Sequence, residues 1–259
     1  MLSRLRNLIG RYVFARSASA LPFYKYLLLN PVVFAIWFHG RRMWWRVTGH
    51  KFRTLAEPGA DLSEFVQGKV LPYNLGNLLI INRDRTERLM LVLRGIRGFS
   101  PKNAQMIVIG PRNEAELLLL SAHGFKLANL SAIDLFSYSP RINLMDMHKL
   151  QFAEDSFDAV YSAFVITYSD DIPRAVREAI RVAKDGAICA FAFEHLSLGS
   201  GNLFGKNNLS GGPRDLLAEF GEHVAHTYWT EDFEREGRYI SSVIFRLTKS
   251  RASAGRSVA

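Results

Sequence analysis

Short apolar runs alternate with helical patterns from residue 103 to residue 248, and this alternation limits the possible folds more than any other feature. Buried strands are predicted where apolar runs end at polar or turn residues, at 105–109, 128–135, 142–145, 157–164 and 187–193. Helices are predicted where apolar residues recur every three or four positions, at 78–96, 113–123, 169–184 and 214–220. Two last strands are predicted at 224–229 and 240–247. The alternation predicts an α/β domain, whose mostly parallel sheet carries helices on both faces.

Three residues suited to ligand binding stand at the ends of predicted strands. Gly110 follows the first strand, Asp134 lies near the end of the second, and Asp146 follows the third. Because ligands bind beyond the carboxyl ends of parallel strands, we expect these residues to meet in one crevice. Glycine lets the backbone approach a ligand closely, and a carboxylate at Asp134 can accept from both ribose hydroxyls of an adenosine group. Such a pair suits NAD and S-adenosylmethionine (AdoMet) equally, and the alternative for Asp134 is a turn-forming role.

Two longer patterns separate these ligands. Residues 146–160 read DMHKLQFAEDSFDAV, which resembles the D-x-x-x-L-P-F-x-D-x-S-F-D-x-V signature of class I AdoMet-dependent methyltransferases of the type 11 family. Residues 175–186 read AVREAIRVAKDG and resemble that family's A-x-x-E-x-x-R-V-L-K-P-G-G. The resemblance implies AdoMet as cofactor and a Rossmann-like, doubly wound sheet of seven strands with an antiparallel last strand. An NAD-dependent oxidoreductase is disfavoured, since those enzymes lack these patterns.

The resemblance also implies roles for individual residues. Asp134 would hold the ribose, Asp146 would accept from the adenine amino group, and Met147 would pack on the adenine ring. Ser162 and the neighbouring Ala163 would lie by the methionine part of the cofactor. For Met147, filling the core is an equally good interpretation.

The first motif departs from the family pattern D/E-x-G-x-G-x-G. Gly110 is kept, but Val108 replaces the acid, Arg112 the second glycine and Glu114 the third. Our hypothesis is that Glu114 supplies the missing carboxylate. The alternative is that Glu114 only favours the N-terminus of a helix through its dipole.

Methyl transfer needs a positioned nucleophile and, for some acceptors, a base. The candidate catalytic bases are His148, Tyr168 and His195, the last slightly preferred; each could instead be a solvent-facing loop residue. The chain lacks the N-P-P-[FY] motif of methyltransferases that act on amino groups in nucleic acids. We therefore expect a small-molecule, lipid or glycan-precursor acceptor, with a non-catalytic, methyltransferase-like binding or scaffold protein as the alternative function.

The positive charge of the chain is concentrated at its start. Residues 1–56 hold ten Lys and Arg and no Asp or Glu, while the remainder holds 23 basic against 24 acidic residues. The balanced remainder argues against a nucleic-acid partner. The apolar stretch 27–38 is too short to span a bilayer, but arginines and three tryptophans follow or overlap it, which favours an interface with anionic lipid. The alternative is an extension that packs on the domain as a lid or dimer arm.

These patterns predict three regions: a basic aromatic extension and linker at 1–70, a methyltransferase-like domain at 71–250, and a disordered tail at 251–259. Pro and Gly residues predict irregular structure over 54–75. We expect a cytoplasmic protein, peripheral at the membrane. The arginine-rich, acid-free segment 1–21 leaves a mitochondrial transit peptide as the alternative. The single cysteine, Cys189, excludes an internal disulfide framework and a multi-cysteine metal site, and no metal is expected.

Overall fold

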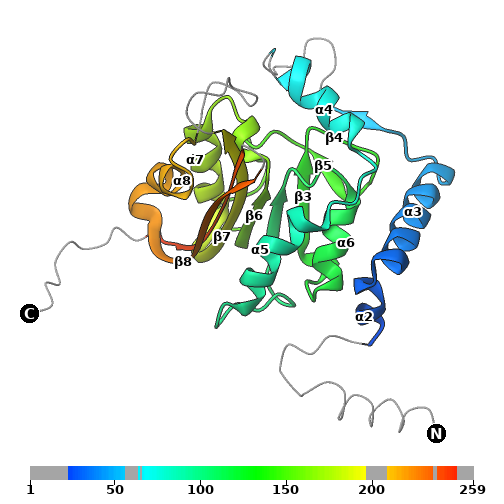
Figure 1. Ribbon diagram of the computed structural model, residues 1–259, viewed down its shortest axis with the longest axis horizontal. Helices are drawn as coiled ribbons and strands as arrows, with labels where there is room; N and C mark the ends of the chain where they lie inside the picture. The colour runs from blue at the N-terminus through cyan, green and yellow to red at the C-terminus, as the bar shows by residue number, and fades with distance from the viewer. Residues whose placement is uncertain (1–22, 56–63, 65, 197–208, 236–237, 250–259) are drawn as a thin grey trace, which may run out of the picture.

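The computed structural model describes residues 23–55, 64, 66–196, 209–235 and 238–249, and its centre is one twisted sheet (Figure 1). The seven strands lie in the order β5-β3-β2-β6-β7-β9-β8. Their bounds are β2 Met106–Ile109, β3 Leu130–Asp134, β5 Ile142–Leu144, β6 Phe157–Ala163, β7 Ala183–Leu196, β8 Val224–Arg235 and β9 Arg238–Leu247. The pairs from β5 to β7 are parallel, and β9 runs antiparallel between β7 and β8. The expected doubly wound sheet with an antiparallel last strand is confirmed.

Side-chain alternation along the buried strands builds a core on each face of the sheet. In β2, Ile107 belongs to the core on one face and Met106 and Val108 to the core on the other. Helices α7 (Ile172–Val182) and α8 (Pro213–Phe220) pack on the first face, and α5 (Arg83–Gly95) and α6 (Glu114–Ala122) on the second. Period-two strands between amphipathic helices therefore give the layers that the sequence predicts.

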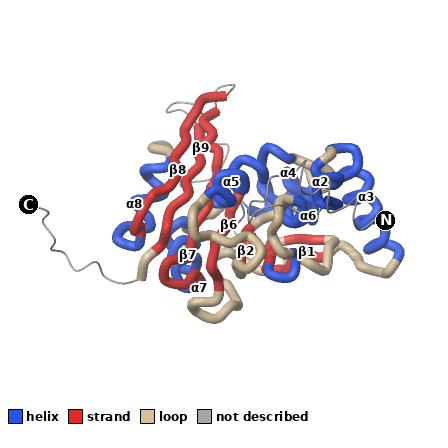
Figure 2. Tube along the Cα trace, turned by 90° about the horizontal axis from the view of Figure 1, so that it is seen from below, coloured by secondary structure: helices blue, strands red, loops and turns tan. Residues whose placement is uncertain are grey.

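The N-terminal part of the described chain packs on α6. Helix α2 (Phe23–Leu29) precedes α3 (Pro31–Val47), which begins where the side chain of Asn30 accepts from two backbone N–H groups. Phe34 and Phe38 of α3 are buried against Ala115, Leu118 and Leu119 of α6. The extension therefore docks on the domain through one face of α3, at the end of the molecule opposite α8 (Figure 2).

The prediction of irregular structure over 54–75 was wrong for much of that range. Strand β1 (Arg53–Thr54) pairs with β4 (Phe136–Ser137), and a π-helical turn at Val66–Val70 leads into α4 (Leu71–Gly76). Pro72 stands in the first turn of α4, where the missing N–H of proline has no helical partner to lose. The same residue type that suggested a break therefore starts a helix here.

Other boundaries shift by a few residues. The helix expected over 78–96 begins at Arg83, because Asn82 caps it. The last two strands are longer than expected and form a hairpin. The transit-peptide alternative for 1–21 and the tail 251–259 lie outside the described residues. In the part of the chain that is described, no helix combines the length and apolarity needed to cross a membrane.

Candidate functional site

A cavity of about 600 Å³ opens beyond the carboxyl ends of β2, β3 and β5. Gly110, Asp134 and Asp146 all line it, so the three strand ends meet in one crevice. The opposite wall comes from the segment before the sheet, with Val70 of the π-helical turn and Asn74 of α4. Sequence reasoning missed this wall because it took the segment for a linker.

The loop after β2 keeps two left-handed positions. Gly110 has φ 66° and Arg112 has φ 49°, and these are the positions of the first two glycines in the family motif. A Cβ built on Gly110 would lie 2.4 Å from Cγ2 of Val165, so that side chain fills the space beside the glycine. The loop therefore has the backbone of a glycine-rich turn but carries an arginine side chain at the second glycine position.

Asp134 is fixed in this loop by backbone donors. The N–H of Leu135 donates to Oδ1 at 2.7 Å and the N–H of Arg112 to Oδ2 at 3.0 Å. Burial raises the pKa of Asp134 to about 6, and these hydrogen bonds oppose the increase. Each carboxylate oxygen accepts one of these backbone hydrogen bonds and retains a lone pair, which can accept from a ligand with two hydroxyl donors.

The imidazole of His148, which also lines the cavity, contacts a carboxylate and a hydroxyl group. Its Nδ1 lies 2.7 Å from Oδ1 of Asp146, and its Nε2 lies 2.7 Å from Oγ of Ser169. Burial alone would lower the pKa of His148, but the hydrogen bond and charge of Asp146 outweigh burial and raise it. Burial alone would raise the pKa of Asp146, but the hydrogen bonds and charge of His148 outweigh burial and lower it below the usual value. Met147 lines the cavity beside them and also packs against the core.

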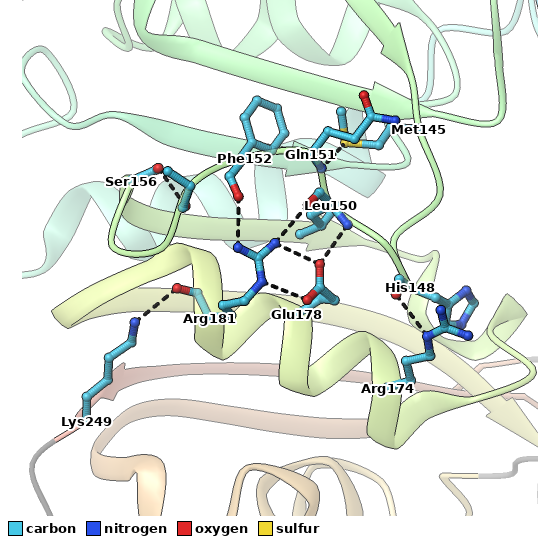
Figure 3. Close-up of polar contacts among 11 residues, drawn as sticks. Met145, His148, Leu150, Gln151, Phe152, Ser156, Arg174, Glu178, Arg181 and Lys249 are labelled. Carbon is cyan, nitrogen blue, oxygen red and sulfur yellow. Dashed lines mark hydrogen bonds and ion pairs between the residues drawn. The ribbon is translucent and has the colours of Figure 1, made fainter.

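Helix α7 holds the loop that carries Asp146, Met147 and His148 (Figure 3). The carboxylate of Glu178 accepts from the backbone N–H of Leu150 at 2.7 Å. Arg181 pairs with Glu178 and donates to the carbonyls of Leu150 and Phe152, each at 2.8 Å. The E-x-x-R part of the second motif thus clamps the loop of the first by its backbone (Figure 3).

Glu114 lies away from the cavity, contrary to the role that we expected for it. Its side chain is only 1% exposed, and Oε1 accepts from Arg41 of α3 at 2.6 Å. The indole N–H of Trp45 donates to Oε2 at 2.7 Å. Because both oxygens are turned to α3, the geometry gives no support to Glu114 as the missing acid of the cofactor pocket. Its observed partners make it the residue that fastens the N-terminal helix.

The remaining candidates are dispersed. Tyr168 lines the cavity, and burial raises the pKa of its phenol to about 12. Ser162 is buried inside the sheet, in register with Ile109 and Phe191, and is not on the cavity wall. His195 is also buried away from the cavity, with Nε2 at 3.1 Å from Oδ1 of Asp232 and its ring stacked on Tyr239. The structure therefore brings Tyr168 to the cavity but not His195 or Ser162.

Two residues that sequence reasoning missed form a buried ion pair, and one of them, Arg85, lines the cavity. Nε of Arg85, on α5, lies 3.1 Å from Oε1 of Glu116, on α6, and Nη2 of Arg85 donates to the carbonyl of Gly110. Burial raises the pKa of Glu116 to about 7, against the opposing effect of the Arg85 charge. An available signal was the acid inside the apolar helix 113–123, since a carboxylate there requires a buried partner.

Comparison with known proteins gives a match over part of the chain. Residues 120–191 match the family model described as "Methyltransferase domain". This part of the chain is similar to methyltransferase domains. The match begins after the loop of Gly110 and Arg112, which is where the chain departs from the family pattern. The resemblance to methyltransferases that the sequence patterns indicate is confirmed over these residues.

The solved structures that resemble this chain have low sequence identity to it. The crystal structure of the MccD protein has a TM-score of 0.51 and 10% identity, over 62% of this chain and 97% of that one. Geranyl diphosphate methyltransferase in complex with SAM has a TM-score of 0.49 and 10% identity, over 75% and 94% of the two chains. The 1,6-didemethyltoxoflavin-N1-methyltransferase of Burkholderia thailandensis has a TM-score of 0.45 and 13% identity, over 91% and 94%. No curated protein matches the chain in sequence.

Proposed function

We propose that this domain binds AdoMet in the 600 Å³ cavity and transfers its methyl group to a small-molecule, lipid or glycan-precursor acceptor. The observation that carries the proposal is the Asp134 carboxylate, held by two backbone donors at the end of β3 and facing the cavity. Ribose hydroxyls are the donors that this position suits. Asp146 and Met147 line the same cavity and provide an acceptor and an apolar contact for adenine.

Bound AdoMet supplies the electrophile, a methyl group on a sulfonium, so the protein has mainly to position the acceptor. The two base candidates on the cavity wall differ in their suitability. A phenol with a pKa of about 12, as in Tyr168, is neutral at physiological pH and can serve as a hydrogen-bond donor. Asp146 orients the imidazole of His148 and raises its pKa, so His148 is the better base of the two.

Calorimetry with S-adenosylhomocysteine (AdoHcy) tests the cofactor assignment. We expect binding by the full chain and a loss of about 10- to 100-fold in Asp134→Asn, because a hydrogen bond to a charged group is replaced by a weaker one. Asp155→Asn is the matched control, since Asp155 is exposed and outside the cavity. Absence of AdoHcy binding at millimolar concentration would refute the assignment and favour a non-catalytic binding protein. An assay for AdoHcy formation with lipid and glycan extracts then tests activity.

We further propose that the outer face of α3 rests on an anionic membrane surface. The face opposite Phe34 and Phe38 presents Ile36, Met43 and Val47, which are 70%, 68% and 73% exposed. Trp44 and Arg46 border these side chains, and the segment up to residue 56 contains no acid. Apolar side chains bordered by tryptophan and arginine suit the headgroup layer of anionic lipid. These side chains support the proposal of a peripheral attachment to the membrane.

Vesicle flotation tests this surface with the full chain. We expect binding to phosphatidylcholine vesicles that contain phosphatidylglycerol and weak binding to phosphatidylcholine alone. Replacing Ile36 and Val47 together by Ser should abolish binding, whereas Leu91→Ser, an exposed apolar position on α5, should not. Equal binding by the α3 variant would contradict the proposal. Concentration-dependent dimerisation that the α3 variant loses would instead assign the surface to a second copy of the chain.

A further inference from the structure

Arg112 lies in the wall between the cofactor cavity and a second cavity of about 330 Å³. Arg85 and Tyr168 line both cavities as well. The second cavity opens beyond the ends of β6 and β7, where Phe164 and Glu194 contribute to its lining. The side chain of Arg112 can therefore be reached by a ligand in either cavity.

The guanidinium of Arg112 is buried, and its hydrogen-bond partner is a neutral side chain. The residue is 8% exposed, and its Nε donates to the neutral side chain of Asn74 at 3.1 Å. Among the described residues, no carboxylate forms a salt bridge with it, since the nearby Glu116 pairs with Arg85. Burial lowers the pKa of Arg112, and the charge of Arg85 lowers it further. A buried cation next to a second cation is stabilised by an anion that reaches it.

Arg85 is fixed in place, and Arg112 is the side chain that can reach a ligand. Arg85 is held by Glu116 and by the carbonyl of Gly110, and its guanidinium lies over the ring of Phe164. Among the described residues, the side chain of Arg112 donates to Asn74 and lies over the ring of Tyr73. Its backbone also occupies a left-handed conformation that a side chain disfavours, so a ligand contact would offset a local cost.

We propose that Arg112 binds an anionic oxygen group of a ligand, a carboxylate or a phosphate, with Arg85 beside it as a fixed second cation. Guanidinium groups bind both kinds of anion through paired N–H donors. The anion has two available sources: the methionine carboxylate of AdoMet in the first cavity, or an acidic acceptor in the second. The first source rests on the proposed function, and the second does not require AdoMet.

Calorimetry on the full chain with three ligands separates these sources. AdoHcy carries the carboxylate, 5′-methylthioadenosine lacks it, and pyrophosphate is a free anion. Arg112→Gln removes the charge, and Arg112→Gly removes the side chain while suiting the φ of 49°. Arg177→Gln is the matched control, because Arg177 is exposed on α7 and lines neither cavity. Circular dichroism and a thermal melt check that each variant folds.

We expect both Arg112 variants to bind their anion about 10- to 100-fold more weakly, while the Arg177 variant is unchanged. Loss of AdoHcy binding with 5′-methylthioadenosine unaffected assigns the anion to the cofactor. Loss of pyrophosphate binding with AdoHcy unaffected assigns it to the acceptor. Unchanged binding of AdoHcy and pyrophosphate by both variants overturns the proposal. If the unaltered chain binds neither adenosine compound, the proposed function fails, and the pyrophosphate comparison still decides the role of Arg112.

Discussion

Replacing Gly110 by Ala should destabilise the domain strongly, because two separate costs meet at this position. The φ of 66° costs an L-residue about 1–2 kcal/mol. The new Cβ would lie 2.4 Å from Cγ2 and 2.8 Å from Cβ of Val165, and overpacking of this kind costs about 1–3 kcal/mol. The free energy of unfolding should therefore fall by roughly 2–5 kcal/mol, which lowers Tm by on the order of 10 °C in a domain of this size.

Denaturant unfolding of a double-mutant cycle separates the two costs. Val165→Ala removes the two methyl groups that meet the new Cβ but keeps the Cβ of residue 165, so it should restore a portion of the loss caused by the contact and leave the backbone part. Gly98→Ala is the control, because Gly98 also has positive φ but nothing lies within 4 Å of its built Cβ. If Gly110→Ala costs no more than Gly98→Ala, or if Val165→Ala restores nothing, the steric reasoning fails.

Three further predictions concern groups around the cavity. Arg181→Met should lower the free energy of unfolding by about 1–3 kcal/mol and weaken AdoHcy binding, because the loop carrying Met147 loses the hydrogen bonds that hold it. Arg177→Met on the same helix should do neither. Denaturant melts measure the stability, and calorimetry measures the binding. Glu114→Gln should loosen α3 and speed tryptic cleavage within it, while the exposed Glu222→Gln should not, and equal cleavage rates would contradict the docking role. AdoHcy affinity should rise as pH increases through about 6, since the raised pKa of Asp134 keeps the carboxyl protonated below that pH. For the same reason, the contribution of Asp134 to folding stability should fall as pH rises from about 4 to 6. Asp134→Asn should remove both dependences in pH-resolved calorimetry and melts.

The parts of the fold that sequence reasoning predicted are those set by local pattern. The sheet follows from period-two and fully apolar runs such as 105–109, and the shared location of Asp134 and Asp146 at one cavity was predicted because strand ends are visible in the sequence. The cavity wall made by α4 was missed because Pro72 and Gly76 read as breaks, although both are compatible with the ends of a short helix. Tertiary packing, not local pattern, decided that segment.

The site residues that were missed depend on which face of an element a residue occupies. His195 was preferred as a base, but neighbouring residues of a strand point to opposite faces, and it is Glu194 that lines a cavity. Arg85 reaches the strand ends only because α5 packs across α6 in one register, which spacing in the sequence does not reveal. A cofactor-binding role was predicted for Glu114 because its partner in the structure, Arg41, lies far away in the sequence.

The left-handed backbone at position 112 bears on how such domains change what they bind. Since the loop already has the conformation that glycine prefers, exchanging Arg112 for glycine, or the reverse, replaces a charge at the cavity wall without rebuilding the turn. If Arg112 binds the anion that we propose, the charge that meets the ligand can change at this position while the backbone architecture and the strand-end carboxylates remain where they are.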